Sequence, residues 1–319
     1  MPPVRHTGAV TGPRSAVVVN PIKVPDPEAL RRLVDERLTG AGWPAPVWFE
    51  TTPEDSGRGQ ATQAMADGAE LVFACGGDGT VMACVTALAG SDVAMAVLPT
   101  GTGNLLAANL GLAGDVATGV QVAIEGGRRR IDVGLVEGQC FAVMAGMGFD
   151  AQMLQSTSER AKKHLGWLAY VGGAVKHLRD RPIRVRITLN GGEPMLRRPR
   201  TVIVANVGRL QGGVRLFPEA ALSGQMPDDG KLDVAILSPN SLSHWAALGW
   251  AVLWRRQRVP LMERYTAERV EIRSSRAQPR QLDGDLIKPG RIMEVRVRPG
   301  ALLLCVPRPG SDPDLAYPA

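Results

Sequence analysis

Long apolar runs are missing from this sequence. No stretch of its 319 residues reaches the roughly 18 uninterrupted apolar residues that mark a membrane-spanning helix. The first residues contain no continuous apolar segment of the kind found in secretory signal peptides, and Pro, Gly, Thr and Arg dominate among them. We therefore expect a chain without a spanning helix, in which residues 1–14 are disordered.

Cysteine is also scarce, and its spacing disfavours two kinds of stabilised domain. The four cysteines lie far apart, and no two of them form a C-x-x-C pair: Cys75, Cys84, Cys140 and Cys305. This spacing argues against a zinc site and against a disulfide framework. Scattered cysteines fit a reducing compartment, so we expect a cytoplasmic protein.

Charge of one sign is not concentrated anywhere in the chain. Thirty-seven Lys and Arg residues stand against 31 Asp and Glu residues, which gives a formal net charge of +6. The basic runs are short, and aromatic residues make up only 4% of the chain. Nucleic-acid-binding proteins usually carry a dense basic stripe or aromatic residues between the basic ones. We therefore expect no nucleic-acid partner and interpret most basic runs as solvated faces.

The sequence does contain enough apolar residues for a large core. Hydrophobic residues make up 45% of the chain, and its length fits two domains. Up to residue 109, short apolar runs typical of buried strands alternate with segments of helical spacing. Strands are expected at residues 15–19, 47–49, 71–74 and 93–98, and helices at 26–38, 60–69, 81–88 and 105–109. This alternation predicts a doubly wound α/β domain with a parallel sheet over residues 15–128.

An apolar run in this domain stops abruptly at two glycines. The turn that follows consists of Gly76, Gly77, Asp78, Gly79 and Thr80, and a helical pattern comes next. Glycines let the backbone approach a ligand closely, and the unpaired amides at the start of a helix favour an anion. Ligands of parallel sheets bind beyond the carboxyl ends of the strands, where this turn is expected. An ordinary strand-to-helix turn is the competing interpretation.

A second polar, glycine-bearing loop follows the next expected strand. It consists of Thr100, Gly101, Thr102, Gly103 and Asn104. A turn with a helix N-cap explains this loop equally well, because Thr and Asn are favoured at such caps. Two such loops at the ends of neighbouring strands favour a phosphate-binding cradle more than either loop does alone.

The pattern changes near residue 128. Short strand-like runs with turn residues between them follow, at 130–136, 141–147, 183–189, 200–207, 232–237, 269–273, 292–297 and 302–306. Two segments of helical spacing interrupt them, at about 152–179 and 242–256. This pattern predicts a β-rich, sandwich-like second domain over residues 129–299.

Two acidic turns stand out in the second half of the chain. They contain Asp228, Asp229 and Asp233, and further on Asp283 and Asp285. Asp-Gly before a strand is a strong hairpin signal, so a simple turn is the first interpretation of both. A carboxylate beside turn carbonyls also supplies the oxygen ligands of Mg²⁺, and a carboxylate beside a substrate hydroxyl can take its proton.

Tryptophan gathers in one segment of the second half. Three of the six tryptophans and three arginines lie there: Trp245, Trp250, Trp254, Arg255, Arg256 and Arg258. A core helix with a basic C-terminal end explains the segment. A helix that lies on a membrane surface explains it equally well.

Taken in order, these motifs resemble the diacylglycerol kinase catalytic-domain family, the soluble bacterial lipid kinases related to sphingosine kinases. The resemblance covers roughly residues 14–307. It rests on Asn20-Pro21, the turn at 76–80, the loop at 98–104 and the acidic turns at 229–233 and 283–285. Gly-Gly-Asp-Gly-Thr alone is shared with NAD kinases, whereas the ordered set is far more specific.

This resemblance implies ATP-dependent phosphorylation of a lipid hydroxyl, most simply that of diacylglycerol to give phosphatidic acid. ATP would lie between the two domains, and in this family the last segment, about residues 300–319 here, returns to the first domain. The residues at matching nucleotide-binding positions are Asn20, Thr51, Gly76, Gly77, Asp78, Gly79, Thr80, Gly101, Thr102 and Asn104. The matching Mg²⁺ ligands are the side chain of Asp229 and the carbonyls of Met226 and Lys231.

The chain departs from the family pattern at the expected general base. The last motif usually reads Asp-Gly-Glu, and here Asp285 replaces the glutamate. A side chain one methylene shorter reaches the same hydroxyl if the backbone shifts or a water bridges the gap. Alternatively, Asp283 is the base, or the activity is weak.

The resemblance also implies a lipid substrate at a membrane surface, reached by transient docking, and it leaves a homodimer open. Three other functions stay open as well: a NAD kinase, a sphingosine-type kinase, and a nucleotide- or lipid-binding regulator without catalysis. The acceptor pocket lies in the second domain, and its shape does not follow from the sequence.

Overall fold

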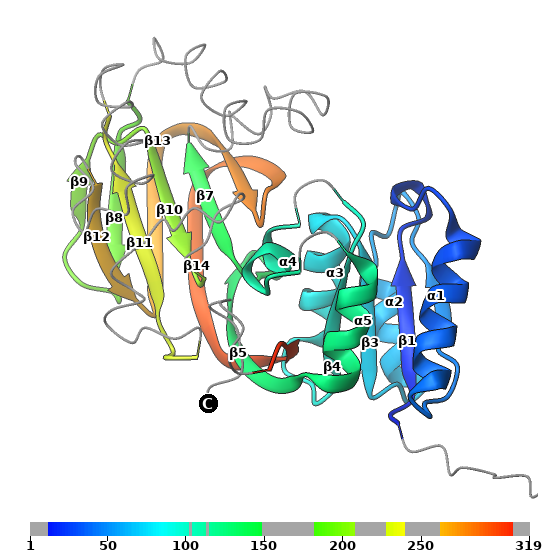
Figure 1. Cartoon of the computed structure of the whole chain (residues 1–319). Coiled ribbons are helices and arrows are strands. Elements are labelled where there is room, and N and C mark those ends of the chain that lie inside the picture. Colours follow the sequence, from blue (N-terminus) through cyan, green and yellow to red (C-terminus); the bar gives the residue numbers. More distant parts are fainter. Residues whose placement is uncertain are drawn as a thin grey trace, which may run out of the picture.

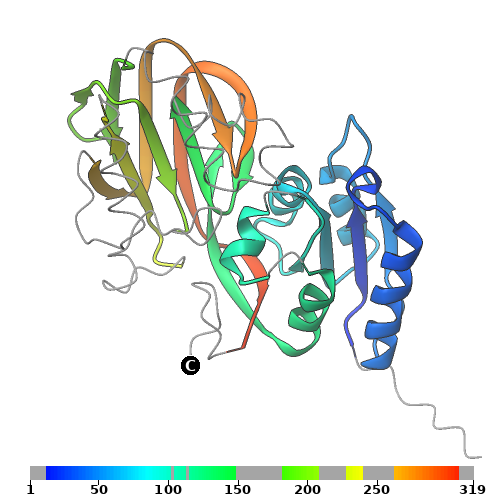
Figure 2. The ribbon, with the colours of Figure 1, turned by 45° about the horizontal axis from the view of Figure 1, so that its top comes forward.

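The computed structural model describes residues 12–101, 104–112, 115–148, 182–207, 228–239 and 262–308. A helix-covered part and a part made of strands lie side by side (Figure 1, Figure 2). Two strands, β5 (Gly127–Val136) and β14 (Asp285–Val306), run from one part to the other. Within the described residues, one sheet of 14 strands continues through both. This arrangement confirms the predicted fold class, an α/β N-terminal domain followed by a β-rich C-terminal domain.

Four parallel strands form the sheet of the N-terminal domain, in the order β4-β3-β1-β2. They are β1 (Ser15–Val19), β2 (Val47–Glu50), β3 (Leu71–Gly76) and β4 (Ala94–Pro99). The helices between them are η1 (Pro21–Lys23), α1 (Pro27–Gly40), α2 (Arg58–Ala66), α3 (Asp78–Leu88), α4 (Leu105–Asn109) and α5 (Val116–Glu125). Every residue of β1, β3 and β4 is buried, because helices cover both faces of the sheet.

Alternate residues of these strands face two separate apolar cores. On one face, Val18 and Val72 pack with residues of α2, α3 and α4. On the other, Val17 and Phe73 pack with residues of α1 and α5. Successive side chains of a strand point to opposite faces, so continuous apolar strands require a helical layer on each side.

Two features of this domain differ from the prediction. The helix expected from residue 81 begins at Asp78, so the second half of the glycine-rich turn belongs to the first turn of α3. The sequence does not predict α5, which contains a glycine at position 119. A Cβ on Gly119 would lie 2.4 Å from the carbonyl oxygen of Val97 in β4. Close packing therefore requires a residue of low helix propensity there, and this residue hides the helical pattern.

The C-terminal domain is built of antiparallel strands. In addition to β5 and β14, they are β6 (Gln139–Phe141), β7 (Met144–Gly148), β8 (Val185–Leu189), β9 (Met195–Arg197), β10 (Thr201–Ala205), β11 (Leu232–Leu237), β12 (Met262–Ala267) and β13 (Arg269–Leu282). Their inward side chains form one apolar cluster that includes Phe141, Ile187 and Met293. This cluster is the separate core of the second domain.

The strands predicted at 292–297 and 302–306 are wrong as separate elements, because β14 covers both. Its register with β5 shifts between Arg298 and Leu302, so the proline and glycine there form a bulge and do not end the strand. The sequence also does not predict β9 and β12.

The helices expected at 152–179 and 242–256, and residues 1–11 of the expected disordered segment, lie outside the described residues. Among the described helices, none is long and apolar enough to cross a membrane.

A buried carboxylate in β5 holds the bulge of β14. Asp132 is fully buried, and its two oxygens accept the amide of Gly300 at 2.7 Å and that of Gly230 at 2.6 Å. Burial raises the pKa of Asp132, and the two amides oppose this shift. Asp132 thus fastens the strand that crosses between the domains to the turn before β11.

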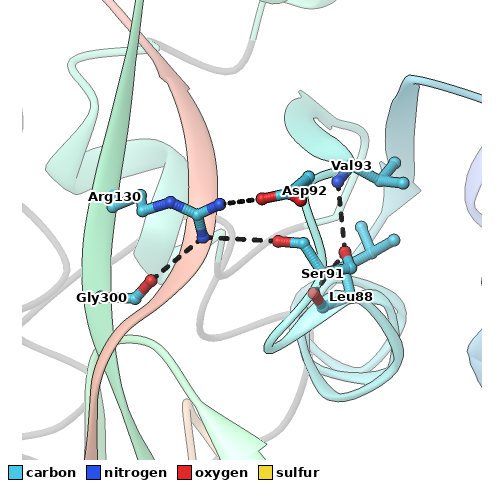
Figure 3. Close-up of polar contacts among 6 residues, drawn as sticks. All are labelled: Leu88, Ser91, Asp92, Val93, Arg130 and Gly300. Carbon is cyan, nitrogen blue, oxygen red and sulfur yellow. Dashed lines mark hydrogen bonds and ion pairs between the residues drawn. The ribbon is translucent and has the colours of Figure 1, made fainter.

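Arg130 fastens the same bulge to the N-terminal domain (Figure 3). Its guanidinium pairs with the carboxylate of Asp92 and donates to the carbonyl oxygens of Ser91, at 3.4 Å, and Gly300, at 3.3 Å. Ser91 and Asp92 lie between α3 and β4, whereas Gly300 belongs to β14. A single side chain therefore contacts both the loop before β4 and the domain-crossing strand.

The far end of β14 lies inside the sheet of the N-terminal domain. Leu303 and Leu304 pair in parallel with β4, and β5 pairs along the other edge of β14. Leu302 and Leu304 are fully buried in the core that α2 and α3 cover. The last of the described strands is thus a central strand of the first domain.

Candidate functional site

The glycine-rich turn joins β3 to α3 at the carboxyl edge of the parallel sheet. β3 ends at Gly76, Gly77 is the N-cap of α3, and Asp78 is the first helical residue. Thr80 is buried and packs against Gly76. The amides of a first helical turn have no partners within the helix, and they carry its positive dipole end. The turn therefore has the backbone geometry of an anion site.

A glycine of the second loop lies directly against this turn. A Cβ on Gly101 would lie 2.5 Å from the Cα atom of Gly77, so no larger residue fits without movement of the backbone. The amides of Thr100 and Gly101 both donate to the carbonyl oxygen of Gly76, at 3.2 Å. Asn104 is left-handed, with φ 47°, and its side-chain amide donates to the carbonyl of Gly101. The two loops predicted as a cradle are therefore in contact.

Asn20 and Thr51 follow β1 and β2 at the same edge. The amide of Asn20 donates to the carbonyl oxygen of Cys75 at 2.9 Å, and its side chain accepts the amide of Ile22 at 3.1 Å. The amide of Thr51 donates to the carbonyl oxygen of Val19 at 2.9 Å, and Thr51 is buried. The structure thus brings the loops after all four strands to one side of the sheet, where ligands of such folds bind.

The second acidic turn of the C-terminal domain is a hairpin. β13 and β14 are joined by Asp283 and Gly284, with Leu282 opposite Asp285. Both turn residues have positive φ, 47° and 92°, as in the type I′ turn that suits a two-residue loop. The hairpin interpretation of this motif is confirmed.

Asp283 is buried and bound by three backbone amides. Its Oδ1 accepts the amides of Val143 at 2.9 Å and Met144 at 2.8 Å, and its Oδ2 accepts that of Ala142 at 2.8 Å. Its own amide donates to the carbonyl oxygen of Met144 at 2.8 Å. These bonds fix the hairpin to the loop between β6 and β7. Because both oxygens are engaged, this geometry favours a positioning role for Asp283 over a role as base.

Asp285 reaches the glycine-rich turn of the other domain. A Cβ on Gly79 would lie 2.7 Å from Oδ2 of Asp285, and a Cβ on Gly284 would lie 4.0 Å from Oδ2 of Asp78. The start of β14 therefore lies against the first turn of α3. Two motifs that are about 200 residues apart in the sequence therefore meet at the junction of the domains.

Three carboxylates, those of Asp78, Asp283 and Asp285, lie near one another at this junction. The pKa of Asp78 is raised to about 7, chiefly by burial and to a smaller extent by the carboxylates of Asp283 and Asp285. The amide of Leu105 opposes this shift through a 2.7 Å hydrogen bond to Oδ1, and the amide of Asn104 opposes it as well. Burial also raises the pKa of Asp283 to about 6, against its three amides. Because a nearby positive charge favours ionised carboxylates, a cation bound beside Asp78 would lower its pKa.

The first acidic turn lies beside the bulge of β14. Asp229 is exposed, and its Oδ1 accepts the amide of Lys231 at 2.9 Å. Its neighbour Asp228 pairs with the buried guanidinium of Arg129 at 3.1 Å. An exposed carboxylate beside turn carbonyls is a donor set that Mg²⁺ accepts, so these residues fit the predicted ion. In the described ranges, no group of three or more His, Cys, Asp or Glu side chains is arranged to hold a metal.

Two predicted site residues, Thr102 and Met226, lie outside the described residues, as does the tryptophan-rich segment from Trp245 to Arg258. Asp132 is a residue that the sequence analysis missed. A carboxylate between the apolar residues Ile131 and Val133 of an expected strand is the signal for it, because a buried charge requires partners.

Two family models match the chain in succession. The one described as "Diacylglycerol kinase catalytic domain" matches residues 14–136. The one described as "YegS C-terminal NAD kinase beta sandwich-like domain" matches residues 143–306. The two matches together span both domains of the structure.

Curated relatives cover most of the chain. A protein of Pseudomonas fluorescens named "Probable lipid kinase YegS-like" is 31% identical over 289 residues, which are 88% of this chain and 91% of that protein. A protein of Bacillus subtilis named "Diacylglycerol kinase" is 31% identical over 240 residues, 71% of this chain and 76% of that protein.

Solved structures share the fold at low sequence identity. A diacylglycerol kinase from Bacillus anthracis strain Sterne has a TM-score of 0.66 at 19% identity, over 93% of this chain and 97% of that one. An NAD kinase from Archaeoglobus fulgidus, solved in complex with ATP, has a TM-score of 0.50 at 14% identity, over 92% of this chain and 93% of that one.

Proposed function

The chain belongs to the diacylglycerol kinase catalytic-domain family of lipid kinases, and from this premise we propose that it transfers the γ-phosphate of ATP to a lipid hydroxyl. Diacylglycerol is the acceptor that the name of the Bacillus subtilis relative indicates, and phosphatidic acid would be the product. The observation that carries the proposal is the contact between Asp285 and the glycine-rich turn, which joins a candidate base to a candidate phosphate site.

The turn at the start of α3 would hold the phosphates of ATP. Phosphoryl transfer depends on positioning and on charge neutralisation, so backbone amides at a helix start are suitable donors. The close contact of Gly101 with Gly77 keeps the two loops together, and Asn20, Thr51 and Thr102 would line the rest of the nucleotide site.

Asp78 would hold a Mg²⁺ ion on the nucleotide, and Asp229 with the carbonyls of Met226 and Lys231 would hold a second, structural one. When bound, the ion at the nucleotide supplies charge neutralisation to the phosphates. The raised pKa of Asp78 supports this role, because burial and the carboxylates of Asp283 and Asp285 disfavour its negative charge, and a bound cation would offset both effects.

Asp285 would take the proton from the acceptor hydroxyl. Its neighbour Asp283 is engaged by three amides and would position it by fixing the hairpin. The missing methylene of Asp285, relative to the usual glutamate, is compatible with this role because Oδ2 already lies at the first turn of α3. The reaction would take place in the cytoplasm, with transient binding to the membrane that contains the lipid.

The test is a kinase assay with the purified full chain, labelled ATP, and diacylglycerol, monoacylglycerol, ceramide and sphingosine in mixed micelles. We expect labelled phosphatidic acid from diacylglycerol. Asp285→Asn is expected to lower kcat by about 10²–10⁴, the usual contribution of a general base, with little change in KM for ATP. Asp67→Asn, at an exposed position of the N-terminal domain, is the matched control and should retain full activity.

The same assay contains the outcomes that contradict the proposal. With NAD added to these acceptors, transfer of label to NAD and to no lipid would make the chain an NAD kinase. Binding of ATP without turnover on any acceptor would make it a nucleotide-binding regulator. Full activity of Asp285→Asn would remove Asp285 from the role of base and leave the lipid kinase intact.

A further inference from the structure

A row of exposed residues crosses four neighbouring strands of the C-terminal domain. The strand register aligns one residue from each of β9, β8, β13 and β14: Leu196, Arg186, Arg273 and Ile292. The next pair along β8 and β9 adds Arg184 and Arg198, since the amide of Ile183 still donates to the carbonyl of Pro199. These six residues are called the basic face below.

The basic face is the outward side of this sheet. Arg186, Arg273 and Ile292 are exposed, whereas their neighbours Ile187 and Ile272 are fully buried in the core of the domain. Leu196 is 71% exposed and Ile292 is 40% exposed, so both large aliphatic side chains are open to the solvent. Alternation along the strands therefore presents arginines and two aliphatic residues together to the solvent.

Positive charge dominates this face. Glu271 is bound by Arg273 through two hydrogen bonds of 2.6 and 3.1 Å, and Glu294 is shared between Arg269 and Arg296. The hydrogen bonds and ion pairs of these two glutamates thus go to arginines of β13 and β14. Arg184, Arg186 and Arg198 remain as a cluster of exposed charges next to Leu196.

We propose that the basic face docks on an anionic phospholipid membrane. Guanidinium groups pair with phosphate oxygens, and exposed aliphatic side chains gain by entering the boundary between headgroups and acyl chains. A nucleic acid offers the same phosphates but nothing to Leu196 and Ile292, and the face carries no aromatic residue for base stacking. The combination of arginine and aliphatic residues is therefore complementary to a lipid surface.

The location of the face fits the proposed kinase function, on which this inference rests. β13 continues from Arg273 to Leu282 and ends at the hairpin that carries Asp285. Docking through this sheet would hold the strand that leads to the candidate base at the membrane that contains the acceptor lipid.

The test is co-sedimentation of the full chain with two kinds of vesicle, phosphatidylcholine alone and phosphatidylcholine mixed with phosphatidylglycerol. Arg186→Glu combined with Arg198→Glu reverses two charges on the basic face. Arg32→Glu combined with Arg37→Glu makes the same change in net charge on exposed positions of α1. Leu196→Ser tests the aliphatic contribution.

We expect the parent chain to bind the mixed vesicles and to lose binding at high salt. The affinity of the basic-face variant for the mixed vesicles should be at least about 25-fold lower than that of the parent. Each arginine near an anionic surface contributes about fivefold to that affinity. The α1 variant should bind like the parent, and Leu196→Ser should bind less tightly. Equal binding by the basic-face and α1 variants, or binding to a DNA oligonucleotide in place of vesicles, would overturn the proposal.

Failure of this inference is distinguishable from failure of the kinase proposal. In non-ionic mixed micelles the basic-face variant should phosphorylate diacylglycerol like the parent, because none of its changed residues lies at the site. Vesicle binding that depends on the basic face, in a protein that phosphorylates no lipid, would support the surface and refute the kinase. Lipid phosphorylation by a protein whose vesicle binding does not depend on the basic face would support the kinase proposal and refute the docking surface.

Discussion

At the scale of single residues, Asp78 combines a candidate function with a cost in stability. Its pKa of about 7 in the folded chain lies well above the value of about 3.9 for an aspartate in an unfolded chain. Between these values the folded chain binds more protons than the unfolded one, so the free energy of unfolding falls as the pH rises. The site thus holds a carboxylate that is costly to ionise unless a cation binds beside it.

Asp78→Asn is expected to flatten the pH dependence of stability in the absence of divalent cations. The parent chain should lose about 2–3 kcal/mol between about pH 5 and about pH 8 through Asp78 alone, because one pKa unit corresponds to about 1.4 kcal/mol. Asparagine keeps a carbonyl oxygen for the amide of Leu105 but carries no charge to desolvate. Urea unfolding at the two pH values measures the difference.

Glu36→Gln, at an exposed position of α1, serves as the control and should follow the parent chain. If Asp78→Asn were instead less stable than the parent at the higher pH, the charge of Asp78 would be stabilising and our account of the site would be wrong. The variant should also lose kinase activity, as is common where a site residue reduces stability.

At the scale of elements, the contact between two loops depends on a single glycine. Gly101 lies so close to the Cα atom of Gly77 that a Cβ would come within 2.5 Å, whereas a Cβ on Gly77 would have its nearest neighbour at 3.8 Å. Gly77 also has an extended backbone conformation that alanine adopts readily. Packing therefore requires glycine at position 101 but not at position 77, which we propose lies at the phosphate site.

Gly101→Ala should destabilise the chain by about 1–3 kcal/mol, because overpacking against backbone forces the loops apart. Gly77→Ala should leave stability nearly unchanged but weaken ATP binding, since its methyl group would lie at the proposed phosphate site. Thermal unfolding and ATP titration measure the two effects. Gly40→Ala at the end of α1, where a Cβ meets nothing within 4 Å, is the control for the substitution itself. Equal stability of the Gly77 and Gly101 variants would refute the distinction.

Elements whose signals are local could be predicted from the sequence. The expected bounds of 15–19, 105–109 and 232–237 are those of β1, α4 and β11. The helix α5 could not be predicted because Gly119 is dictated by contact with β4. The length of β14 could not be predicted either, because its prolines and glycines occupy bulges that only the partner strands define.

The candidate site shows the same division. The order of motifs along the chain predicted which loops gather at the edge of the sheet. The engagement of Asp283 could not be predicted, since its three donors at 142–144 lie in a distant part of the sequence. The same holds for the contact between Asp285 and Gly79, which arises from the packing of two domains.

At the scale of the whole molecule, β5 and β14 make the two domains mechanically dependent on each other. Leu304 is fully buried in the N-terminal domain, although the strand that carries it begins at the hairpin of the C-terminal domain. Asp132 and Arg130 bind the bulge where that strand crosses between domains. We therefore expect the domains to unfold in one cooperative transition.

Leu304→Ala should reduce stability by about 2–5 kcal/mol, the usual cost of a cavity in a core. Hydrogen exchange followed by mass spectrometry should show equal loss of protection in β1 and β3 of the first domain and in β10 and β11 of the second. Leu196→Ala, at a position that is 71% exposed, should change neither the stability nor the hydrogen-exchange protection of either domain. Loss of protection confined to the first domain would contradict the coupling.

The place of β14 in the N-terminal sheet has a consequence for the order of events during synthesis. A ribosome makes the chain from its N-terminus, so β1 to β4 are available long before Leu303 and Leu304 emerge to pair with β4. Until then one side of β4 is an open edge, a template for pairing with other chains. The N-terminal domain is therefore completed only by a strand that is made after most of the C-terminal domain, and a gene fragment that stops before β14 would encode a sheet with that edge exposed.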